Sequence, residues 1–416
     1  MKPASDGFAG FYAGRRVLVT GDTGFKGSWL TFWLRDLGAD VCGYALEPPT
    51  EPNLYTALGL GQEVAQHIAD VRDLTALEAV FRDFCPEIVL HLAAQPLVRA
   101  SYVDPVLTYE TNVIGTVNVL EAARRSAGSG DRRPLVIVNV SSDKCYENVE
   151  AAKAYDEADP LGGFDPYSSS KACGELVTAA YRRSFFGPGS LVRVASARAG
   201  NVIGGGDWAP DRIVPDCARA LSRRQPVTVR NPGAVRPWQH VLESLSGYLW
   251  LAACLWHENG RAVSASAGSA LAGSAGGSAR LDGAWNFAPP PDSAQTVRSV
   301  VELFLRAWGE GDWRLAEGAL DDKTHEAGRL LLDASKAHRE LGWRSAWTVE
   351  QAVRATVDWY RAFYGTSGEI DQGPDDSVAA PHERLAAHTR DDISAYTLAA
   401  ATQGARWAVP DRARET

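Results

Sequence analysis

The sequence lacks any apolar run that approaches the roughly 20 residues needed to span a bilayer. Its opening stretch, MKPASDGFAGFYAGRR, has no apolar segment of the kind found in secretory signal peptides. The six cysteines form no C-x-x-C pair and no cluster with histidines, which argues against a zinc site or a disulfide framework. We therefore expect a cytoplasmic protein with reduced cysteines, no metal and no membrane partner.

Positive charge is also scarce. Lys and Arg number 42 against 51 Asp and Glu, the formal net charge is −9, and no stretch is rich in basic residues. Such a chain is a poor partner for nucleic acid or an anionic membrane surface. Any anionic ligand must therefore be held by cations that gather in a local pocket.

What the sequence does contain, up to about residue 200, is an alternation of β-branched runs and helical patterns. The expected strands are 16–20, 41–45, 65–69, 87–92, 134–140 and 190–198. A helix is expected over 74–84 with Asp73 as its cap. Another begins at Pro105 after Asp104, with Val106 and Leu120 on one face. This pattern predicts an α/β fold, a Rossmann-type doubly wound parallel sheet.

The pattern loosens after residue 200, which indicates a second part of the molecule. We expect residues 1–200 to form the Rossmann-type sheet domain and 201–365 a smaller, partly interleaved C-terminal lobe. Segments near 230–258 and 284–290 are expected to return to the sheet domain.

Three further features belong to the C-terminal half. Helical patterns cover 211–223 and 242–257. The Ala/Gly/Ser-rich stretch 259–283 has few large apolar side chains and is interpreted as a flexible surface insertion. The remainder, 366–416, is expected to be a tail with a terminal helix near 384–400.

A glycine-rich turn follows the first expected strand, in TGDTGFKGSWL. Gly21, Gly24 and Gly27 are three residues apart, and an amphipathic helix begins directly after them. Glycines let backbone N–H groups approach a pyrophosphate, and the helix N-terminus adds favourable partial charge. The turn therefore predicts a dinucleotide site.

The end of the second strand favours NAD over NADP. Ala45 stands where an acid would hold a ribose hydroxyl, Glu47 is nearby, and no arginine follows to attract a 2′-phosphate. Asp70, which closes the third strand, either binds the adenine edge or caps a turn.

Two polar groups of residues follow later strands. NVSSDKCYEN places Ser142, Asp143 and Lys144 at the end of a buried strand, where a polar turn is the alternative interpretation. DPYSSSKACGELV places Tyr167 and Lys171 on one helix face. A lysine beside a phenol favours the phenolate, which can take a hydroxyl proton. Together with the glycine turn, these residues indicate a hydride-transfer enzyme.

At this point the chain resembles the extended short-chain dehydrogenase/reductase family, and within it the nucleotide-sugar 4,6-dehydratases that act on CDP-glucose. The segments that carry the resemblance are GDTGFKGSWL, YALEPPTEPNLY, HLAAQPLVRASY, NVSSDKCYEN, PYSSSK, RAGNVIGGGDWAPDRIVPD and RNPGAVRPWQHV. They cover most of residues 15–257 in order, and 382–396 is similar to a diverged form of the family's closing helix.

The resemblance implies a cycle without net redox change. Hydride leaves C4 of the glucose ring for NAD, water is lost across C5 and C6, and hydride returns to C6. Tyr167 would be the base at the 4-hydroxyl, Lys171 would lower the pKa of Tyr167 and hold the nicotinamide ribose, and Ser142 would bind the 4-oxygen. Asp143 would protonate the departing hydroxyl.

Lys144 stands where related dehydratases usually have a glutamate that acts on the C5 proton. A neutral Lys144 could remove that proton directly, which is the role we favour. A charged Lys144 could instead stabilise the enolate while another group takes the proton.

The resemblance also assigns the binding residues. The cofactor set is Gly21, Gly24, Phe25, Gly27, Asp70, Val71, Ala93, Tyr167 and Lys171. The substrate set is Gln95, Asn201, Arg212, Arg236 and His240, with Arg236 as the first choice for the diphosphate. The family further implies a homodimer.

Two rival functions stay open. A nucleotide-sugar 4-epimerase shares the glycine turn, Ser142, Tyr167 and Lys171, but it needs no acid at C6, which disfavours it. A dinucleotide-binding sensor without catalysis would have no reason to retain the same three polar residues.

Overall fold

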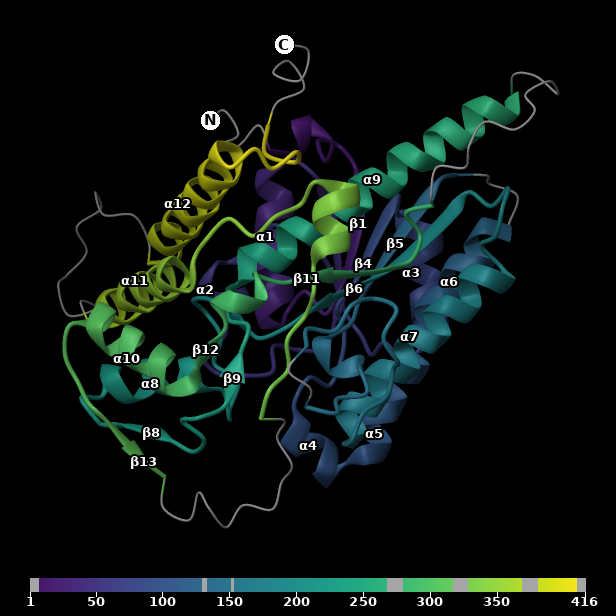
Figure 1. Ribbon diagram of the computed structural model, residues 1–416. Helices are drawn as coiled ribbons and strands as arrows, with labels where there is room; N and C mark the ends of the chain where they lie inside the picture. Colours follow the sequence, from purple (N-terminus) through teal and green to yellow (C-terminus); the bar gives the residue numbers. More distant parts are fainter. Residues whose placement is uncertain are drawn as a thin grey trace.

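A seven-stranded parallel sheet lies at the centre of the computed structural model, which describes residues 7–128, 133–150, 153–267, 280–316, 328–368 and 381–409 (Figure 1). In spatial order the strands are β11 (Ala284–Phe287), β6 (Val192–Ala199), β5 (Leu135–Val140), β4 (Ile88–His91), β1 (Arg16–Thr20), β2 (Asp40–Ala45) and β3 (Ala65–Ile68). Strand order reverses between β1 and β4, and such a switch point opens a crevice at the carboxyl ends of the strands. The predicted doubly wound α/β fold is confirmed.

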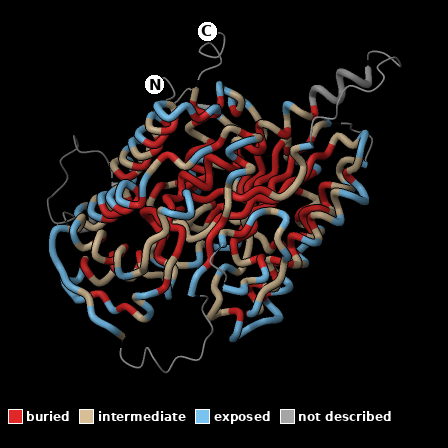
Figure 2. Tube along the Cα trace, viewed as in Figure 1, coloured by how far each residue is buried: buried red, intermediate tan, exposed pale blue. Residues whose placement is uncertain are grey.

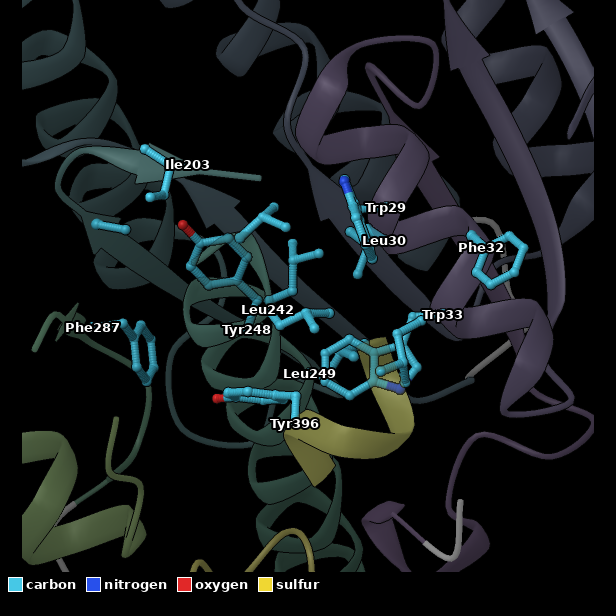
Figure 3. Close-up of a cluster of buried hydrophobic side chains, with 14 of the residues drawn as sticks. Trp29, Leu30, Phe32, Trp33, Ile203, Leu242, Tyr248, Leu249, Phe287 and Tyr396 are labelled. Carbon is cyan, nitrogen blue, oxygen red and sulfur yellow. The ribbon is translucent and has the colours of Figure 1, made fainter. Parts of the chain in front are cut away.

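Different helices cover the two faces of the sheet. On β1, Val17 and Val19 face one core with α1 (Phe25–Asp36) and α9 (Val241–Ala267). Leu18 faces the other core, with α3 (Leu74–Phe84) and α6 (Gly115–Gly128). Figure 2 shows buried residues concentrated along the sheet, and Figure 3 shows the large side chains that fill the space between α1 and α9.

Capping bonds define the starts of two helices, and the first of these starts is the one predicted at Asp73. Asp73 Oδ1 accepts a hydrogen bond from the Ala76 amide at 3.0 Å, which starts α3. Asp165 accepts from the Ser168 amide at 2.9 Å, and Pro166 opens α7 (Pro166–Ser184). The second cap fixes where the Tyr167 helix begins.

A smaller lobe packs against the carboxyl ends of the strands. Its helices are α8 (Ile213–Ser222), α10 (Val297–Trp308) and α11 (Val349–Gly368), and α12 (Pro381–Thr402) lies on α11 and α1. Outside the main sheet, the described residues form three two-stranded ladders. They pair β8 (Val227–Val229) with β13 (Trp313–Leu315), β9 (Val235–Arg236) with β12 (Gln295–Thr296), and β7 (Val202–Ile203) with β10 (Gln239–His240). Helices α10 and α11 and these ladders were not predicted from the sequence.

The prediction that 259–283 is a flexible surface insertion is wrong for the residues at both ends of this range. Helix α9 continues to Ala267, and Asn259 is buried, with its Nδ2 donating to the Leu191 carbonyl at 2.6 Å. Leu281 packs against the core, and the Gly283 carbonyl accepts from the Ser196 amide at 2.9 Å. Both ends are held by long-range contacts that composition does not reveal. Residues 268–279 lie outside the described part of the chain.

The helix predicted from Pro105 is divided rather than continuous. Helix α4 (Val98–Val103) precedes it, and α5 (Pro105–Tyr109) joins α6 through a π-turn at Glu110–Ile114. The wider turn rotates the exposed face. As a result Val106 is 65% exposed whereas Leu120 is buried, so the two do not share one face.

Among the described residues, no helix combines the length and apolar character that crossing a membrane requires.

Candidate active site

A cavity of about 1610 Å³ lies at the carboxyl ends of the strands, between the sheet and the lobe. Most of the predicted site residues line it: Gly21, Gly24, Phe25, Gly27, Asp70, Val71, Ala93, Gln95, Ser142, Asp143, Lys144, Tyr167, Lys171, Asn201, Arg212 and Arg236. Segments that are far apart in the sequence therefore meet at one site.

The glycine turn forms the cavity wall after β1. Gly21 has a φ of +75°, and a Cβ there would lie 2.7 Å from the Ala93 amide nitrogen. A Cβ on Gly27 would overlap the Gly21 carbonyl oxygen. Glycine is therefore required at both positions, and the turn exposes backbone to the cavity as a pyrophosphate site needs. These residues fit the predicted dinucleotide.

Asp70 lines the cavity but is held by a neighbour. Its carboxylate accepts hydrogen bonds from the Arg72 amide at 2.9 Å and from the Arg72 guanidinium at 2.7 Å. These bonds lower the pKa of Asp70. Asp70 stabilises its own turn, as one of the two interpretations expected. It also faces the cavity, so a bond to the adenine edge stays a prediction.

The strand β5 ends in a short 3-10 turn, η4 (Asp143–Cys145), which carries the polar cluster. Ser142 Oγ donates to Asp143 Oδ1 at 2.9 Å and accepts from the Lys144 amide at 3.3 Å. The Lys144 Nζ lies 3.7 Å from Asp143 Oδ1. Asp143 is 2% exposed, and its Oδ2 has no hydrogen-bond partner among the described residues. As a carboxylate, Asp143 could accept a hydrogen bond from a ligand hydroxyl through this oxygen, and as a carboxylic acid it could give a proton to a ligand oxygen.

Tyr167 and Lys171 lie one turn apart on α7 and face the same cavity. Burial raises the pKa of Tyr167 to about 12, although a hydrogen bond with Ser142 opposes this rise. Burial also lowers the pKa of Lys171 to about 8. Burial thus outweighs the effect that the sequence analysis expected from Lys171. A further positive charge is needed at this site before the phenolate forms near neutral pH.

A buried ion pair belongs to the hydrogen-bond network next to the polar cluster at the end of β5. Glu175 on α7 binds Arg198 on β6, with Nε and Oε1 2.8 Å apart, and both side chains are almost fully buried. Arg198 also donates to the Tyr146 hydroxyl at 2.7 Å, and that hydroxyl donates to Asn286 Oδ1 at 2.8 Å. The network connects α7, β6, β11 and Tyr146, the residue that directly follows η4, so it fixes Tyr167 relative to Asp143.

Three of the predicted substrate residues stand on the lobe side of the cavity. Asn201 Oδ1 is buried and has no partner in the described chain. Arg212 pairs with Asp207 at 2.9 Å, and this carboxylate raises the pKa of the guanidinium, with a smaller contribution in the same direction from Tyr167. The Arg236 guanidinium donates to the carbonyls of Val235 at 3.0 Å and Gly328 at 3.1 Å. The positive charges gather locally, as an acidic chain requires.

The prediction for His240 is contradicted. His240 is 1% exposed, does not line the cavity, and packs between the rings of Trp29 and Trp347 at 5.8 and 5.0 Å. Burial lowers its pKa to about 3, so it is a neutral core residue. The pattern R-P-W-Q-H does not reveal that the chain turns inward at β10, away from Arg236.

Gln95 lines the cavity, yet its amide is engaged in its own loop. Its Nε2 donates to the Leu97 carbonyl at 3.1 Å and to Thr108 Oγ1 at 2.9 Å, and its Oε1 accepts from the Leu97 amide at 2.6 Å. A role in substrate binding stays a prediction, limited to the remaining acceptor capacity of the oxygen.

Lys26 is a cavity residue that was not predicted from the sequence. This lysine lines the cavity from the first turn of α1, and its Nζ donates to the Tyr248 hydroxyl at 2.7 Å. A signal was present, because Lys26 is the only charged residue between Asp22 and Arg35. Asp207 and Arg219, which also line the cavity, carried no such signal.

Comparison with known proteins shows the family. The model of the NAD dependent epimerase/dehydratase family matches residues 17–261, and the chain belongs to this family. The chain is 45% identical, over 85% of its length and 92% of the relative's, to CDP-glucose 4,6-dehydratase of Salmonella typhimurium. The family resemblance inferred from the motifs is confirmed, and so is NAD as the cofactor.

Solved structures agree with this assignment. DesIV, a dTDP-glucose 4,6-dehydratase from Streptomyces venezuelae crystallised with NAD, is similar with a TM-score of 0.66 and 25% identity, covering 84% of this chain and 98% of its own. UDP-glucose 4-epimerase of Thermus thermophilus in complex with NAD is similar with a TM-score of 0.63 and 26% identity, covering 83% and 99%.

Proposed function

We propose that the protein is an NAD-dependent hydro-lyase that converts CDP-glucose to CDP-4-keto-6-deoxyglucose. The observation that carries the proposal is the position of Ser142, Asp143 and Lys144 in one cavity with Tyr167 and Lys171. A 4-epimerase needs the serine, the tyrosine and the second lysine, but it has no task for an acid at C6. The choice of CDP-glucose is supported by the 45% identity to the Salmonella enzyme.

The residues around the cavity account for both halves of the reaction. NAD would supply the hydride acceptor for C4 of the sugar and then the hydride donor for C6. Tyr167 takes the proton of the 4-hydroxyl, and Ser142 donates a hydrogen bond to the same oxygen. The ketone acidifies the C5 proton, which Lys144 removes and gives back to C5 when hydride is added at C6. Asp143, as a carboxylic acid, protonates the C6 hydroxyl as it leaves. Lys171 holds the ribose and supplies positive charge to Tyr167.

The remaining cavity residues divide between the two ligands. Backbone groups of the glycine turn would bind the cofactor pyrophosphate, with Phe25, Val71 and Ala93 around the ring systems. Arg236 and Arg212 would bind the substrate diphosphate, and Asn201 would donate to a phosphate or sugar oxygen through its amide. The buried, unpartnered oxygen of Asn201 supports its use by a ligand hydroxyl.

The test is a substrate screen. Purified protein is incubated with NAD and with CDP-, dTDP-, GDP- or UDP-glucose, and the products are identified by mass and by the 4-keto group. We expect a 4-keto-6-deoxy product from CDP-glucose. A galactose product without loss of water would establish the epimerase, and no product from any sugar would establish the sensor. Tyr167→Phe, which retains the ring, should abolish product formation.

The proposal extends to assembly and location. Val106, Ile114 and Leu176 form an exposed apolar face on α5, the π-turn and α7, which we call the α5–α7 face. A second copy of the chain would cover this face in a homodimer. A cytoplasmic location is supported by six free cysteines, since disulfides are typical of oxidising compartments.

A further inference from the structure

Lys26 occupies an unusual position for a lysine. It lies inside the glycine turn, between Gly24 and Gly27, where the chain opens α1. The rest of the first two turns of α1 is apolar or small, and Trp29 and Leu30 are fully buried in the core (Figure 3). Lys26 instead points its amine toward the cavity wall and the Tyr248 hydroxyl.

The surroundings of this amine are short of negative charge. Among the described residues its hydrogen-bond partner is the Tyr248 hydroxyl, and its Nζ lies 4.8 Å from the centre of the Tyr248 ring. Lys171 and Arg212 act on it as like charges, and Asp143 is the charged group that opposes them. Burial and the two cations lower the pKa of Lys26 to about 7. An ammonium in this position is stabilised by any loss of positive charge beside it.

The same groups identify what lies beside Lys26 when the site is loaded. Lys171, Asp143 and Tyr167 surround the reacting carbon in the proposed function. The charges of Lys171 and Asp143 both act on the Lys26 amine. The cofactor would lie over the glycine turn that contains Lys26, and its nicotinamide would have to reach the carbon bound at Tyr167 in the same cavity. This path would bring the ring close to the Lys26 amine.

We propose that Lys26 shifts the hydride equilibrium of the bound cofactor toward the reduced form. Hydride uptake removes the positive charge of the nicotinamide ring, so a nearby ammonium favours the neutral ring over the cationic one. A dehydratase must hold the reduced cofactor and the keto-sugar together until water has left, and this bias lengthens that interval. Tyr248 holds the ammonium in place but carries no charge of its own.

The experiment measures coenzyme preference without turnover. Full-length protein is equilibrated with mixtures of NAD⁺ and NADH, and the bound fractions are quantified after rapid gel filtration. Lys26→Met keeps the length of the side chain and removes the charge. We expect its preference for NADH over NAD⁺ to fall at least about tenfold, because even at an effective dielectric of about 20 one close charge contributes that much.

Two matched variants separate charge from shape. Lys26→Arg should stay within about threefold of the parent, and Tyr248→Phe should have a smaller effect than Lys26→Met. If Lys26→Met does not fold, Lys26→Gln serves in its place. An unchanged partition in the uncharged variant overturns the inference, and so does an equal loss of both coenzymes, which would make Lys26 a phosphate ligand.

The inference rests on the proposed function, because it needs the nicotinamide to reach Tyr167. The two fail differently. If the parent binds neither coenzyme, the proposed function is wrong. If the parent binds both and Lys26→Met has the parent's preference, only the role of Lys26 is wrong.

Discussion

Lys144 has two possible tasks, and its surroundings bear on both. Its Nζ is 3.7 Å from Asp143 Oδ1, and the side chain is 28% exposed toward the cavity. To act as a base, the lysine must be a neutral amine. To stabilise an enolate, it must be a positively charged ammonium. The Nζ lies beside the carboxyl group that would protonate the leaving C6 hydroxyl, so both side chains would act on neighbouring carbons of one sugar.

Lys144→Ala should lower the rate of CDP-4-keto-6-deoxyglucose formation by about 10²-fold, the usual contribution of a proton-transfer group. We expect exchange of the C5 proton with deuterated solvent to be lost in parallel, because removal of this proton is the step affected. Lys144→Arg separates the two roles, since it keeps the charge and cannot act as a neutral base. Rescue by arginine would support stabilisation of the enolate, and a near-parental rate in Lys144→Ala would contradict both roles.

The pKa of Lys171 leads to a prediction about stability. Burial lowers it from 10.5 to about 8, so between these values the unfolded chain binds more protons than the folded protein. Stability should therefore rise as the pH increases from about 8 to 10.5. Lys171→Met removes this effect, and we expect it to be more stable than the parent by about 1–3 kcal/mol near pH 7, with the difference shrinking at higher pH.

Urea denaturation at several pH values, without added cofactor, measures this difference. Lys153→Met is the control, because Lys153 is an exposed lysine whose pKa is raised by its bond with Asp159. That variant should keep the parental rise in stability across the same window. A Lys171→Met protein less stable than the parent at neutral pH would show that the buried amine stabilises the fold.

At the scale of whole elements, the strands of the sheet were predictable and the lobe was not. The run Leu135, Val136, Ile137 and Val138 is buried on both faces of the sheet, so it is apolar without interruption and visible in one short window. The lobe ladders are two or three residues long and form between distant segments, such as Val227–Val229 with Trp313–Leu315. Their pairing is set by tertiary contacts that no local pattern encodes.

The candidate site divides in the same way. Gly21, Tyr167 and Lys171 stand in motifs whose spacing is fixed by a local turn or helix, and the structure brings them together. His240 lies in an equally suggestive segment, but its direction depends on Trp29 and Trp347 from other elements. A local motif in the sequence therefore predicts which polar residues could take part in a site. Tertiary packing determines which of those residues face the cavity.

The ion pair between Glu175 and Arg198 makes a prediction about how α7 is held. Glu175→Gln leaves the Arg198 charge buried and uncompensated, and we expect a loss of about 3–5 kcal/mol in the free energy of unfolding. Substituting Arg198→Met in the same chain should recover most of that loss, because no buried charge is left. Denaturant titration of the parent, both single variants and the double variant measures the coupling. A loss below about 1 kcal/mol for Glu175→Gln would mean that water reaches the arginine.

For the molecule as a whole, the α5–α7 face is the feature that its monomer leaves unexplained. Val106 is 65%, Leu176 58% and Ile114 49% exposed, and α4, α5 and α7 lie side by side at one end of the molecule (Figure 1). Apolar side chains grouped in this way cost free energy in water and are typical of a protein interface. The Tyr167 helix, α7, contributes Leu176 to this face, so assembly would also stiffen the site.

Leu176→Glu should convert the protein to a monomer at micromolar concentration, because a carboxylate at the centre of an apolar interface loses its hydration without gaining a partner. Sedimentation velocity measures the mass of the parent and the variant. Leu398→Glu is the matched control: Leu398 is 69% exposed on α12, outside the α5–α7 face, and its substitution should leave the assembly unchanged. A parent that sediments as a monomer would contradict the homodimer, and loss of assembly in Leu398→Glu alone would move the interface to α12.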